Sequence, residues 1–442
     1  MAQDLSPESA AALPDFVWDP RIAAYRAPAH RYRALRLALL HDRHHLVDDV
    51  LHITKRGSRW STVDLRPYQR SALLAWRAAG RKGLVALPTG SGKTRLACAV
   101  MAACEAPSLC LVPTRVLLHQ WRSELARHYR GELGCLGDGE RRIEHVTVAT
   151  FESAYRWMPE LGHRFGQLIV DEAHHFGTGM RDEALEMCAA PLRLGLTATA
   201  PSGTQLARLS DLLGPVVFQL TAGDLTGEWL ADFDVAALRL QLNDDERARY
   251  DQAVAVFRPV HRAFRLAFPN AGWRDFVATA RRSEAGRAAL AAYWTSRRIT
   301  HYTAAKAKAV AALLAEHRSS RVLVFTPDND TAYAIAREHL VMPITCDIGR
   351  TERDQAIAAF RSGALRVLVS ARVLNEGFDV PDADVAIIVG GTLGEREHVQ
   401  RVGRVLRPAA GKRASVFELI AAETHEVYKA EERARALEPS AA

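Results

Sequence analysis

The chain contains the octapeptide Leu87-Pro88-Thr89-Gly90-Ser91-Gly92-Lys93-Thr94, between an apolar run at 83–87 and a helix-forming run at 95–101. Strand, glycine loop and helix, in that order, are the context in which a P-loop binds phosphates. Thr89, Gly90, Ser91 and Gly92 form the predicted loop, whose backbone N–H groups turn inward around the phosphates. Lys93 is predicted to reach the β- and γ-phosphates, and the Thr94 hydroxyl to bind Mg²⁺. A chance glycine turn would not explain the flanking strand and helix, so the segment predicts an α/β fold that binds MgATP.

A second motif, Asp171-Glu172-Ala173-His174, follows the apolar run at 167–170. Open α/β sheets place their ligands at the carboxyl ends of strands, where these carboxylates are expected. Asp171 is predicted to hold the metal, and Glu172 to act as the base that orients and deprotonates the attacking water. Alone, the motif could be a solvated helix start with acidic residues favoured by the helix dipole. Paired with the P-loop, it predicts ATP hydrolysis.

Apolar runs of strand length alternate with helical patterns in both halves of the chain. They lie at 108–112, 146–151, 168–170 and 193–196 in the first half, and at 321–326, 365–369, 385–389 and 414–419 in the second. Such alternation predicts parallel sheets covered by helices on both faces. A chain of 442 residues exceeds the length, about 250–300 residues, at which one core stops growing. At least two domains are therefore expected.

Positive charge gathers in the middle of the chain. The whole protein carries a net charge of +7, yet residues 258–308 alone contain 11 lysines and arginines against two acidic residues. Aromatic residues interleave with these cations, including Phe264, Trp273 and Tyr293. Residues 241–299 read as mainly helical. The combination favours phosphate contact and base stacking; the alternative is a helical hairpin with core aromatics and solvated arginines.

The motifs together resemble superfamily 2 helicases and translocases, and within them the XPB-like branch (xeroderma pigmentosum group B), from about residue 18 to 419. Additional segments with this resemblance are Leu65–Gln69, Val112–Arg115, Thr150–Phe151, Leu196–Thr199, Asn375–Pro381 and Gln400–Pro408. The resemblance implies two RecA-like parallel-sheet lobes, a helical thumb-like insertion and a small N-terminal domain. The implied ranges are 1–62 for the N-terminal DNA-engaging domain, 63–240 for lobe 1, 241–302 for the insertion and 303–442 for lobe 2.

The resemblance also implies residue roles. Contacts to ATP are expected from Arg66, Gln69, Gly377 and Asp379, and the amide of Gln69 suits the edge of adenine. Coupling of hydrolysis to movement is expected from His174, Thr197, Thr199 and Gln400. Nucleic-acid contacts are expected from Thr114, Arg115, Thr150, Trp273, Arg281 and Arg282. Arg404 and Arg407 are expected to reach the γ-phosphate from the second lobe, as arginine fingers do.

The chain departs from the XPB pattern at one point. That branch carries an Arg-Glu-Asp element soon after the third motif, whereas Thr199 is followed by Ala-Pro-Ser-Gly-Thr-Gln at 200–205. The nearest candidates, Arg208 and Asp211, are three residues apart and could be a helix pair. Duplex unwinding is therefore less secure than nucleic-acid-stimulated ATP hydrolysis.

The expected function is ATP-dependent movement on, or opening of, duplex or forked DNA in DNA repair. The alternatives are an RNA helicase or a motor subunit of a restriction or remodelling assembly, and a non-enzymatic nucleic-acid clamp. A partner nuclease, a monomeric state and a cytoplasmic location without membrane association are also expected, since no signal or spanning segment is seen. His41, His44, His45 and His52 lack a recognised metal-ligand spacing and are read as surface residues.

Overall fold

The computed structural model describes residues 10, 13, 15–41, 47–51, 59–179, 181–225, 232–269, 271–371, 383–390 and 413–435. The chain divides into two compact units, with the first division after Thr221. Across the described ranges, no helix combines the length and apolarity needed to cross a membrane.

Eight strands form the sheet of the first unit, in the order β10-β3-β9-β8-β4-β7-β5-β6. They are β3 (Lys82–Ala86), β4 (Ser108–Val112), β5 (Leu133–Gly137), β6 (Glu140–Arg142), β7 (Val146–Thr150), β8 (Gln167–Val170), β9 (Leu192–Thr197) and β10 (Val216–Gln219). All neighbours are parallel except the β5–β6 hairpin. The four strands expected in this half are thus confirmed, and their apolar sequence reflects a sheet buried on both faces.

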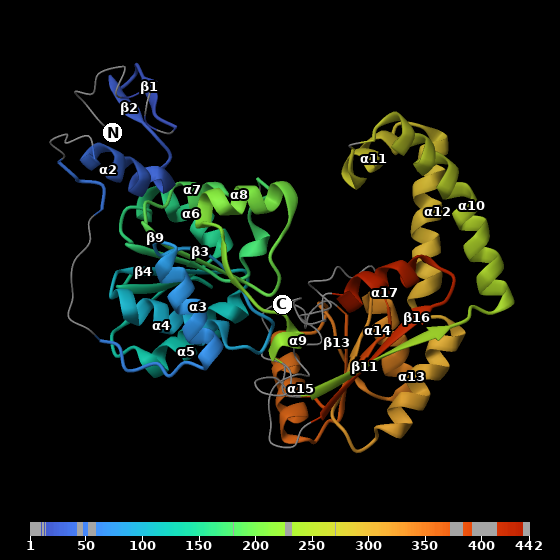
Figure 1. The fold of residues 1–442 in the computed structure, drawn as a ribbon. Coiled ribbons are helices and arrows are strands. Elements are labelled where there is room, and N and C mark those ends of the chain that lie inside the picture. The colour runs from blue at the N-terminus through green and yellow to red at the C-terminus, as the bar shows by residue number, and fades with distance from the viewer. Residues whose placement is uncertain are drawn as a thin grey trace. The chain divides into compact units, whose positions relative to one another are not determined.

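Helices cover both faces of this sheet (Figure 1). One face carries α3 (Pro67–Ala78), α4 (Lys93–Cys104) and α5 (Arg115–His128); the other carries α6 (Phe151–Leu161), α7 (Glu183–Glu186) and α8 (Gly203–Leu213). The second face buries a continuous core that includes Leu111, Met158, Leu168 and Leu212. The P-loop follows β3, the carboxylates follow β8, and Thr197 ends β9. Because these strands are parallel neighbours, the predicted motifs meet at one edge of the sheet.

The described N-terminal residues belong to the first unit. They form β1 (Val17–Asp19), β2 (Ala24–Arg26), the 3₁₀ turn η1 (Ala29–Arg31) and α2 (Tyr32–His41), with β1 and β2 paired antiparallel. Leu35 and Leu39 of α2 form a small core with Leu13. An ion pair of 2.6 Å joins Arg31 to Asp211 of α8, so this piece is attached to the first sheet's helical cover.

Six parallel strands form the sheet of the second unit, in the order β11-β16-β15-β12-β14-β13. They are β11 (Asp232–Leu240), β12 (Val322–Phe325), β13 (Met342–Ile344), β14 (Val367–Ser370), β15 (Val385–Ile388) and β16 (Arg413–Ala421). The associated helices are α9 (Ala222–Leu225), α13 (Ala304–Glu316), α14 (Asn329–His339), α15 (Arg350–Ser362) and α17 (His425–Arg435). The two predicted parallel-sheet lobes are therefore confirmed.

One strand lies on the other side of an expected boundary. The boundary at residue 240 placed 232–240 with the first lobe, but β11 pairs with β16 of the second sheet along all nine residues. This register is specified by the alternation of Leu238 and Leu240, which pack against the second core. The sequence offered no partner for this strand because parallel pairing is not local.

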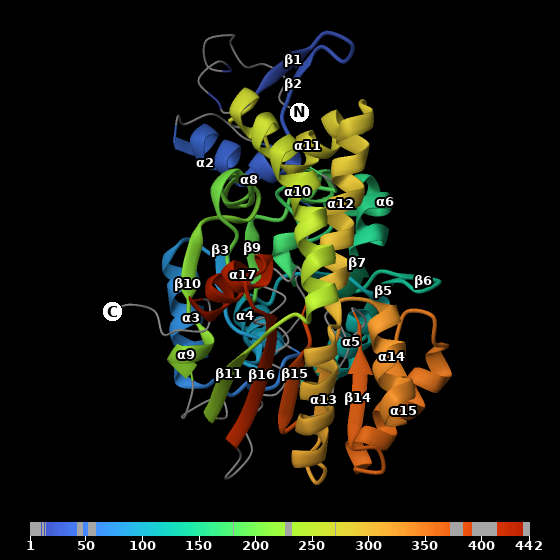
Figure 2. The same ribbon diagram turned by 90° about the vertical axis from the view of Figure 1, so that its right-hand side faces the viewer.

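Three helices follow β11: α10 (Asp244–Ala267), α11 (Trp273–Ala280) and α12 (Glu284–His301). Figures 1 and 2 both show α10 and α12 side by side, reaching away from the second sheet, with α11 at their far end. Asn243 caps α10 by accepting a hydrogen bond from the Glu246 N–H, and Ser283 caps α12 through the Gly286 N–H. The mainly helical insertion expected at 241–299 is confirmed.

Candidate functional site

The predicted P-loop adopts the backbone that phosphate binding requires. Gly90 and Gly92 have φ of 85° and 79°, which is the left-handed region that favours glycine. A Cβ atom on Gly92 would lie 2.6 Å from Nε2 of Gln69, so a larger residue would also displace the Gln69 amide. Lys93 donates from Nζ to the carbonyl oxygens of Leu87 and Pro88, at 3.0 and 3.4 Å. The lysine is thereby held across the mouth of the loop, and Thr94 follows it in the first turn of α4.

Two side chains of α3 hold the loop from below. Tyr68 donates its hydroxyl to the Ser91 carbonyl at 2.6 Å, and Gln69 donates Nε2 to the Ser91 and Gly92 carbonyls at 2.7 and 3.3 Å. Oε1 of Gln69 accepts from the N–H of Arg66 and closes the start of α3. The adenine contact expected of Gln69 and Arg66 stays a prediction. Because Gln69 is hydrogen-bonded to the Ser91 and Gly92 carbonyls, the position of its side chain depends on the position of the P-loop.

Asp171 is buried at the end of β8 and is held in one orientation. Its Oδ2 accepts a hydrogen bond from the indole Nε1 of Trp121 at 2.8 Å, and its Oδ1 accepts from the Glu172 N–H at 3.0 Å. Burial raises the pKa of this carboxyl above its usual value, while Lys93 and the Trp121 hydrogen bond oppose the rise. A carboxylate fixed beside a lysine and a loop of N–H groups is suited to hold a cation on bound phosphates.

Glu172 occupies an unusual backbone conformation beside this carboxylate. Its φ and ψ are 48° and 49°, which costs a non-glycine residue about 1–2 kcal/mol. Strained backbone of this kind gathers at functional sites. The conformation turns the chain from β8 into the 3₁₀ turn η2 (Ala173–His175), and Oε2 of Glu172 comes within 3.4 Å of Nδ1 of His174.

The predicted coupling residues of the first lobe lie in one chain of contacts. Nδ1 of His174 is 3.2 Å from Oγ1 of Thr197, and Thr197 donates from Oγ1 to the Thr199 carbonyl at 2.8 Å. Gln205 of α8 supports the same turn by donating Nε2 to the His174 and Phe176 carbonyls. His174, which lies beside the Glu172 carboxylate, is thus connected through Thr197 to the segment that follows β9.

The predicted nucleic-acid residues on the first unit sit at helix starts. Thr114 and Thr150 cap α5 and α6, each accepting a backbone N–H at 3.2 Å. Arg115 is 74% exposed and pairs with Asp138 at 3.5 Å, where His119 also binds at 2.8 Å. Free N–H groups at a helix start favour phosphate, and the arginine adds charge. Contact with nucleic acid stays a prediction for all three residues.

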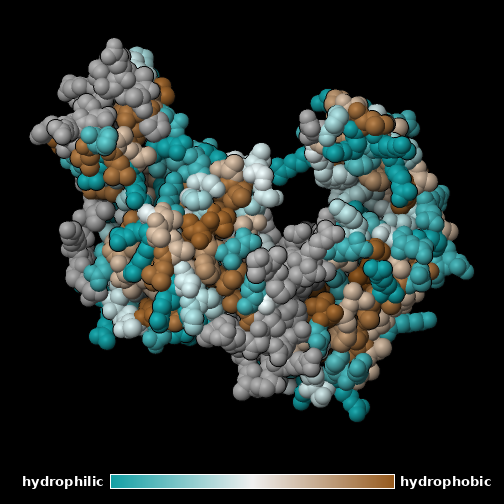
Figure 3. Space-filling model, viewed as in Figure 1, coloured by the Kyte–Doolittle hydropathy of each residue, from teal (hydrophilic) through white to brown (hydrophobic). Residues whose placement is uncertain are grey.

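The basic helical insertion resolves into a packed interior and a charged exterior. Phe264 and Phe276 are buried in a small core, so they are not available for base stacking. Trp273 packs against Tyr293 with ring centroids 4.4 Å apart and remains 38% exposed. Figure 3 shows hydrophobic residues among hydrophilic ones at the end that carries α11. Arg281 and Arg282 are exposed there, whereas the Lys306 counted with this patch is buried in an ion pair with Glu426.

Several predicted residues lie outside the described ranges. They are Gly377, Asp379, Gln400, Arg404 and Arg407, together with His44, His45 and His52. His41 is the last residue of α2 and is exposed. Arg208 and Asp211 form a 3.2 Å ion pair along α8, and Arg208 also binds Glu186. They are the helix pair that sequence spacing allowed.

Sequence reasoning missed the side chains that orient the predicted ones. Trp121, Tyr68 and Gln205 each donate to a residue of the site or to its backbone. Trp121 and Tyr68 sit on amphipathic helices at core spacing, so the sequence shows them only as buried aromatics. A polar atom on a core-facing side chain was the available signal, because buried Trp and Tyr groups usually find a partner.

Three family profiles match successive parts of the chain. The profile "Xeroderma pigmentosum group B helicase damage recognition domain" matches residues 3–50, "Type III restriction enzyme, res subunit" matches 62–202, and "Helicase conserved C-terminal domain" matches 305–409. Two solved structures share the fold alone. They are the Hef helicase domain of Pyrococcus furiosus (TM-score 0.51, 17% identity, 84% of this chain and 98% of that one) and Dbp5 of S. cerevisiae bound to RNA and ADP BeF3 (0.55, 15%, 84% and 87%).

Curated relatives extend the similarity along most of the chain. "DNA 3'-5' translocase XPB2" of Sulfurisphaera tokodaii is 32% identical over 93% of this chain and 94% of its own length. "DNA 3'-5' helicase XPB" of Mycobacterium tuberculosis is 30% identical over 80% of this chain but only 60% of its own length. The chain likewise spans 47% of the longer XPB subunit of general transcription and DNA repair factor IIH from Danio rerio. With its P-loop, its Asp-Glu-Ala-His turn and its two parallel sheets, the chain belongs to the XPB family of helicases and translocases.

Proposed function

We propose that this chain is an ATP-driven translocase that moves along DNA. The observation that carries the proposal is the line of contacts from Glu172 through His174 to Thr197 and Thr199. It connects the predicted hydrolysis site with the segment after β9, as a motor requires. Membership of the XPB family supports DNA as the polymer and the 3'-5' direction named for the relatives.

The residues at the site fit MgATP. The Thr94 hydroxyl and the Asp171 carboxylate are oxygen donors of the kind that Mg²⁺ prefers. Oγ1 of Thr89 is buried in the loop without a hydrogen-bond partner among the described residues, which leaves it available to a phosphate oxygen. When bound, Mg²⁺ neutralises charge on the phosphates. In this proposal Lys93 leaves the Leu87 and Pro88 carbonyls for the β- and γ-phosphates, and the loop N–H groups hold the remaining oxygens.

Glu172 is proposed as the general base. Its carboxylate follows the metal-holding Asp171 directly, so it is placed to accept a proton from water that attacks the γ-phosphate. His174, 3.4 Å from its Oε2, is placed to keep that carboxylate oriented. Arg404 and Arg407 are proposed to complete the site as arginine fingers, which are worth about 10³ to 10⁵ in turnover. Their role rests on the sequence motif.

The proposed DNA contacts are Thr114, Arg115 and Thr150 on the first unit and Arg281 and Arg282 on the insertion. Translocation is the firmer part of the proposal, because no Arg-Glu-Asp element follows Thr199 and Arg208 is engaged with Asp211 and Glu186. Binding of a partner nuclease and a monomeric state stay predictions.

The test is ATP hydrolysis by the full chain with no polymer, duplex DNA, forked DNA, single-stranded DNA or RNA, with Lys93→Ala as the blank. Stimulation by DNA that vanishes in the blank is expected. Stimulation by RNA alone would make the chain an RNA helicase. ATP binding without turnover under every condition would make it a nucleic-acid clamp.

A further inference from the structure

A basic cavity lies in the first unit, away from the predicted ATP site. Its volume is about 610 Å³, within the range of small-molecule sites. It is bounded by α2, by the turn between α3 and β3, and by the start of β9. These are the amino ends of β3 and β9, whereas the P-loop follows the carboxyl end of β3. Five residues of strand, roughly 16 Å, separate the two positions.

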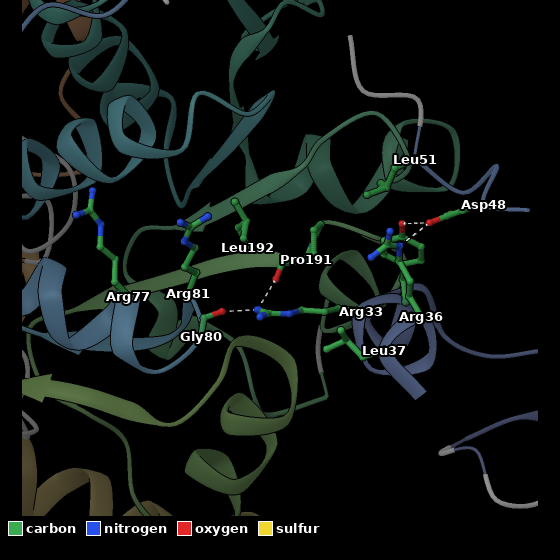
Figure 4. Close-up of a pocket in the computed structure, with 11 residues that line it drawn as sticks. Arg33, Arg36, Leu37, Asp48, Leu51, Arg77, Gly80, Arg81, Pro191 and Leu192 are labelled. Carbon is green, nitrogen blue, oxygen red and sulfur yellow. Dashed lines mark hydrogen bonds and ion pairs between the residues drawn. The ribbon is translucent and has the colours of Figure 1, made fainter. Parts of the chain in front are cut away.

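The lining carries four arginines and one carboxylate. Arg33 donates to the Gly80 and Pro191 carbonyls and so fastens α2 over the turn. Arg36 pairs with Asp48 at 2.8 Å. Among the described residues, Arg77 and Arg81 have neither a side-chain hydrogen bond nor an ion pair. Figure 4 shows their side chains extending in the same direction, on the side of the cavity away from Arg36 and Asp48. Two exposed cations that have no counterion within the described ranges therefore face one cavity.

The backbone at Arg81 is a second observation. Gly80 and Arg81 both have positive φ, 72° and 64°. Glycine takes this conformation freely, but arginine pays about 1–2 kcal/mol for it. The turn is held by hydrogen bonds from the Arg81 N–H to the Trp76 carbonyl and from the Arg193 N–H to the Arg81 carbonyl. Arg81 thus adopts a backbone conformation that has a lower free energy for glycine or asparagine, and its guanidinium lines the cavity.

We propose that this cavity binds a phosphate group, held by Arg77 and Arg81. Guanidinium groups match phosphate in charge and in the geometry of paired N–H donors. Asp48 opposes the anion from the far side and limits its affinity. The phosphate could come from a nucleic-acid strand or from free phosphate, and both sources share this chemistry. The inference does not rest on the proposed ATPase.

The test compares Arg77→Gln/Arg81→Gln with Arg156→Gln/Arg164→Gln, which removes two exposed arginines of the same unit that do not line the cavity. All proteins are full chains in a Lys93→Ala background, without ATP, so failure of hydrolysis cannot affect the result. Binding of a labelled single-stranded oligonucleotide is measured against salt concentration. Loss of two phosphate contacts is expected to lower the slope of log K on log salt by about 1.4, and the control pair to leave it unchanged.

Two further arms separate the sources and the rivals. Inorganic phosphate is followed by phosphorus NMR line width; broadening lost in the cavity variant, with an unchanged oligonucleotide slope, assigns the site to free phosphate. Asp48→Asn should strengthen binding of whichever source is used. If polyglutamate displaces the labelled oligonucleotide but inorganic phosphate does not, the proposal is overturned in favour of an acidic protein segment as the ligand. If the cavity variant binds both the oligonucleotide and phosphate as the wild type does, Arg77 and Arg81 are only solvated side chains at a helix end, and the proposal is overturned.

Folding of the variants is checked by thermal unfolding. If the double variant is destabilised, Arg77→Gln alone carries the comparison, because it leaves the strained turn at Arg81 intact. Its expected change in slope is half as large, about 0.7. A correctly folded Arg77→Gln protein with the wild-type slope and wild-type phosphate broadening would also overturn the proposal.

Discussion

Nδ1 of His174 lies 3.2 Å from Oγ1 of Thr197, although 23 residues separate them in the chain. β8 and β9 are parallel neighbours, so the residues that follow β8 and those that end β9 meet at one edge of the sheet. Thr197 passes the contact on to the Thr199 carbonyl. In the proposed motor, a change at the γ-phosphate that moves Glu172 and His174 would alter these contacts and so shift the segment after β9.

Removal of the Thr197 hydroxyl should uncouple the two events. Thr197→Val keeps the volume and loses the contacts to His174 and Thr199, at a cost typical of one hydrogen bond, about 1 kcal/mol. We expect nucleotide affinity within about twofold of wild type and a fall of about fivefold in DNA stimulation of ATP hydrolysis. Thr197→Ser restores the hydroxyl and is the matched control. Equal stimulation in wild type and Thr197→Val would remove this contact from the coupling path.

Trp121→Phe tests the support of Asp171. The substitution keeps an aromatic ring in the core but removes the 2.8 Å hydrogen bond to Oδ2. Hydrogen bonds to charged groups are worth about 1.5–3 kcal/mol, so we expect the Mg²⁺ concentration needed for half-maximal activity to rise roughly 10- to 100-fold. The readout is the Mg²⁺ concentration for half-maximal hydrolysis, which a packing defect alone would not shift. Trp157→Phe, which alters a tryptophan packed on the opposite face of the sheet, is the control.

Glu172→Gln should separate binding from chemistry. The amide retains the size of the side chain but cannot accept a proton from water, and general-base catalysis contributes about 10²- to 10⁴-fold. We expect turnover to fall by that factor while ATP and DNA binding persist. Single-turnover hydrolysis and equilibrium nucleotide binding measure the two quantities. A variant with wild-type turnover would show that another group activates the water.

The sequence predicted the parts of the site that local patterns specify. The P-loop, the carboxylates after β8 and the core strands each combine a short motif with an apolar run, and all of them meet at one sheet edge. The membership of β11 could not be predicted, since its partner β16 lies about 180 residues further along the chain. Nor could the roles of Trp121 and Tyr68, because their polar atoms act across helix packing. Burial of Phe264 and Phe276 likewise depends on how α10 and α11 pack, which composition does not reveal.

The attachment of the N-terminal piece should weaken in acid. His30 is buried beside Asp211, Arg31, Lys82 and Arg193, and burial together with the positive charge of Arg193 lowers its pKa from 6.5 to about 4. Between these two values the unfolded state binds the proton and the folded state does not, so stability rises with pH there. One such group contributes at most about 1.4 kcal/mol per pH unit. As the pH is lowered from 6.5 to 4, the free energy of unfolding of the His30→Gln variant should therefore fall less steeply than that of the wild type. Parallel curves for the two proteins would contradict this assignment.

The charge of the helical insertion can be separated from its packing. Arg281 and Arg282 directly follow α11 and have exposed side chains, so their removal leaves the Phe264 and Phe276 core intact. If each contacts a phosphate, Arg281→Ala/Arg282→Ala should weaken duplex binding and lower the slope of log K on log salt by about 1.8. Arg318→Ala/Arg337→Ala, exposed arginines elsewhere in the same unit, should leave the slope unchanged. Trp273→Ala is expected to weaken the binding of single-stranded DNA more than the binding of duplex DNA, because stacking requires unpaired bases. A wild-type slope in the Arg281/Arg282 variant, with thermal stability retained, would show that these arginines are solvated and that the proposed grip on DNA lies elsewhere.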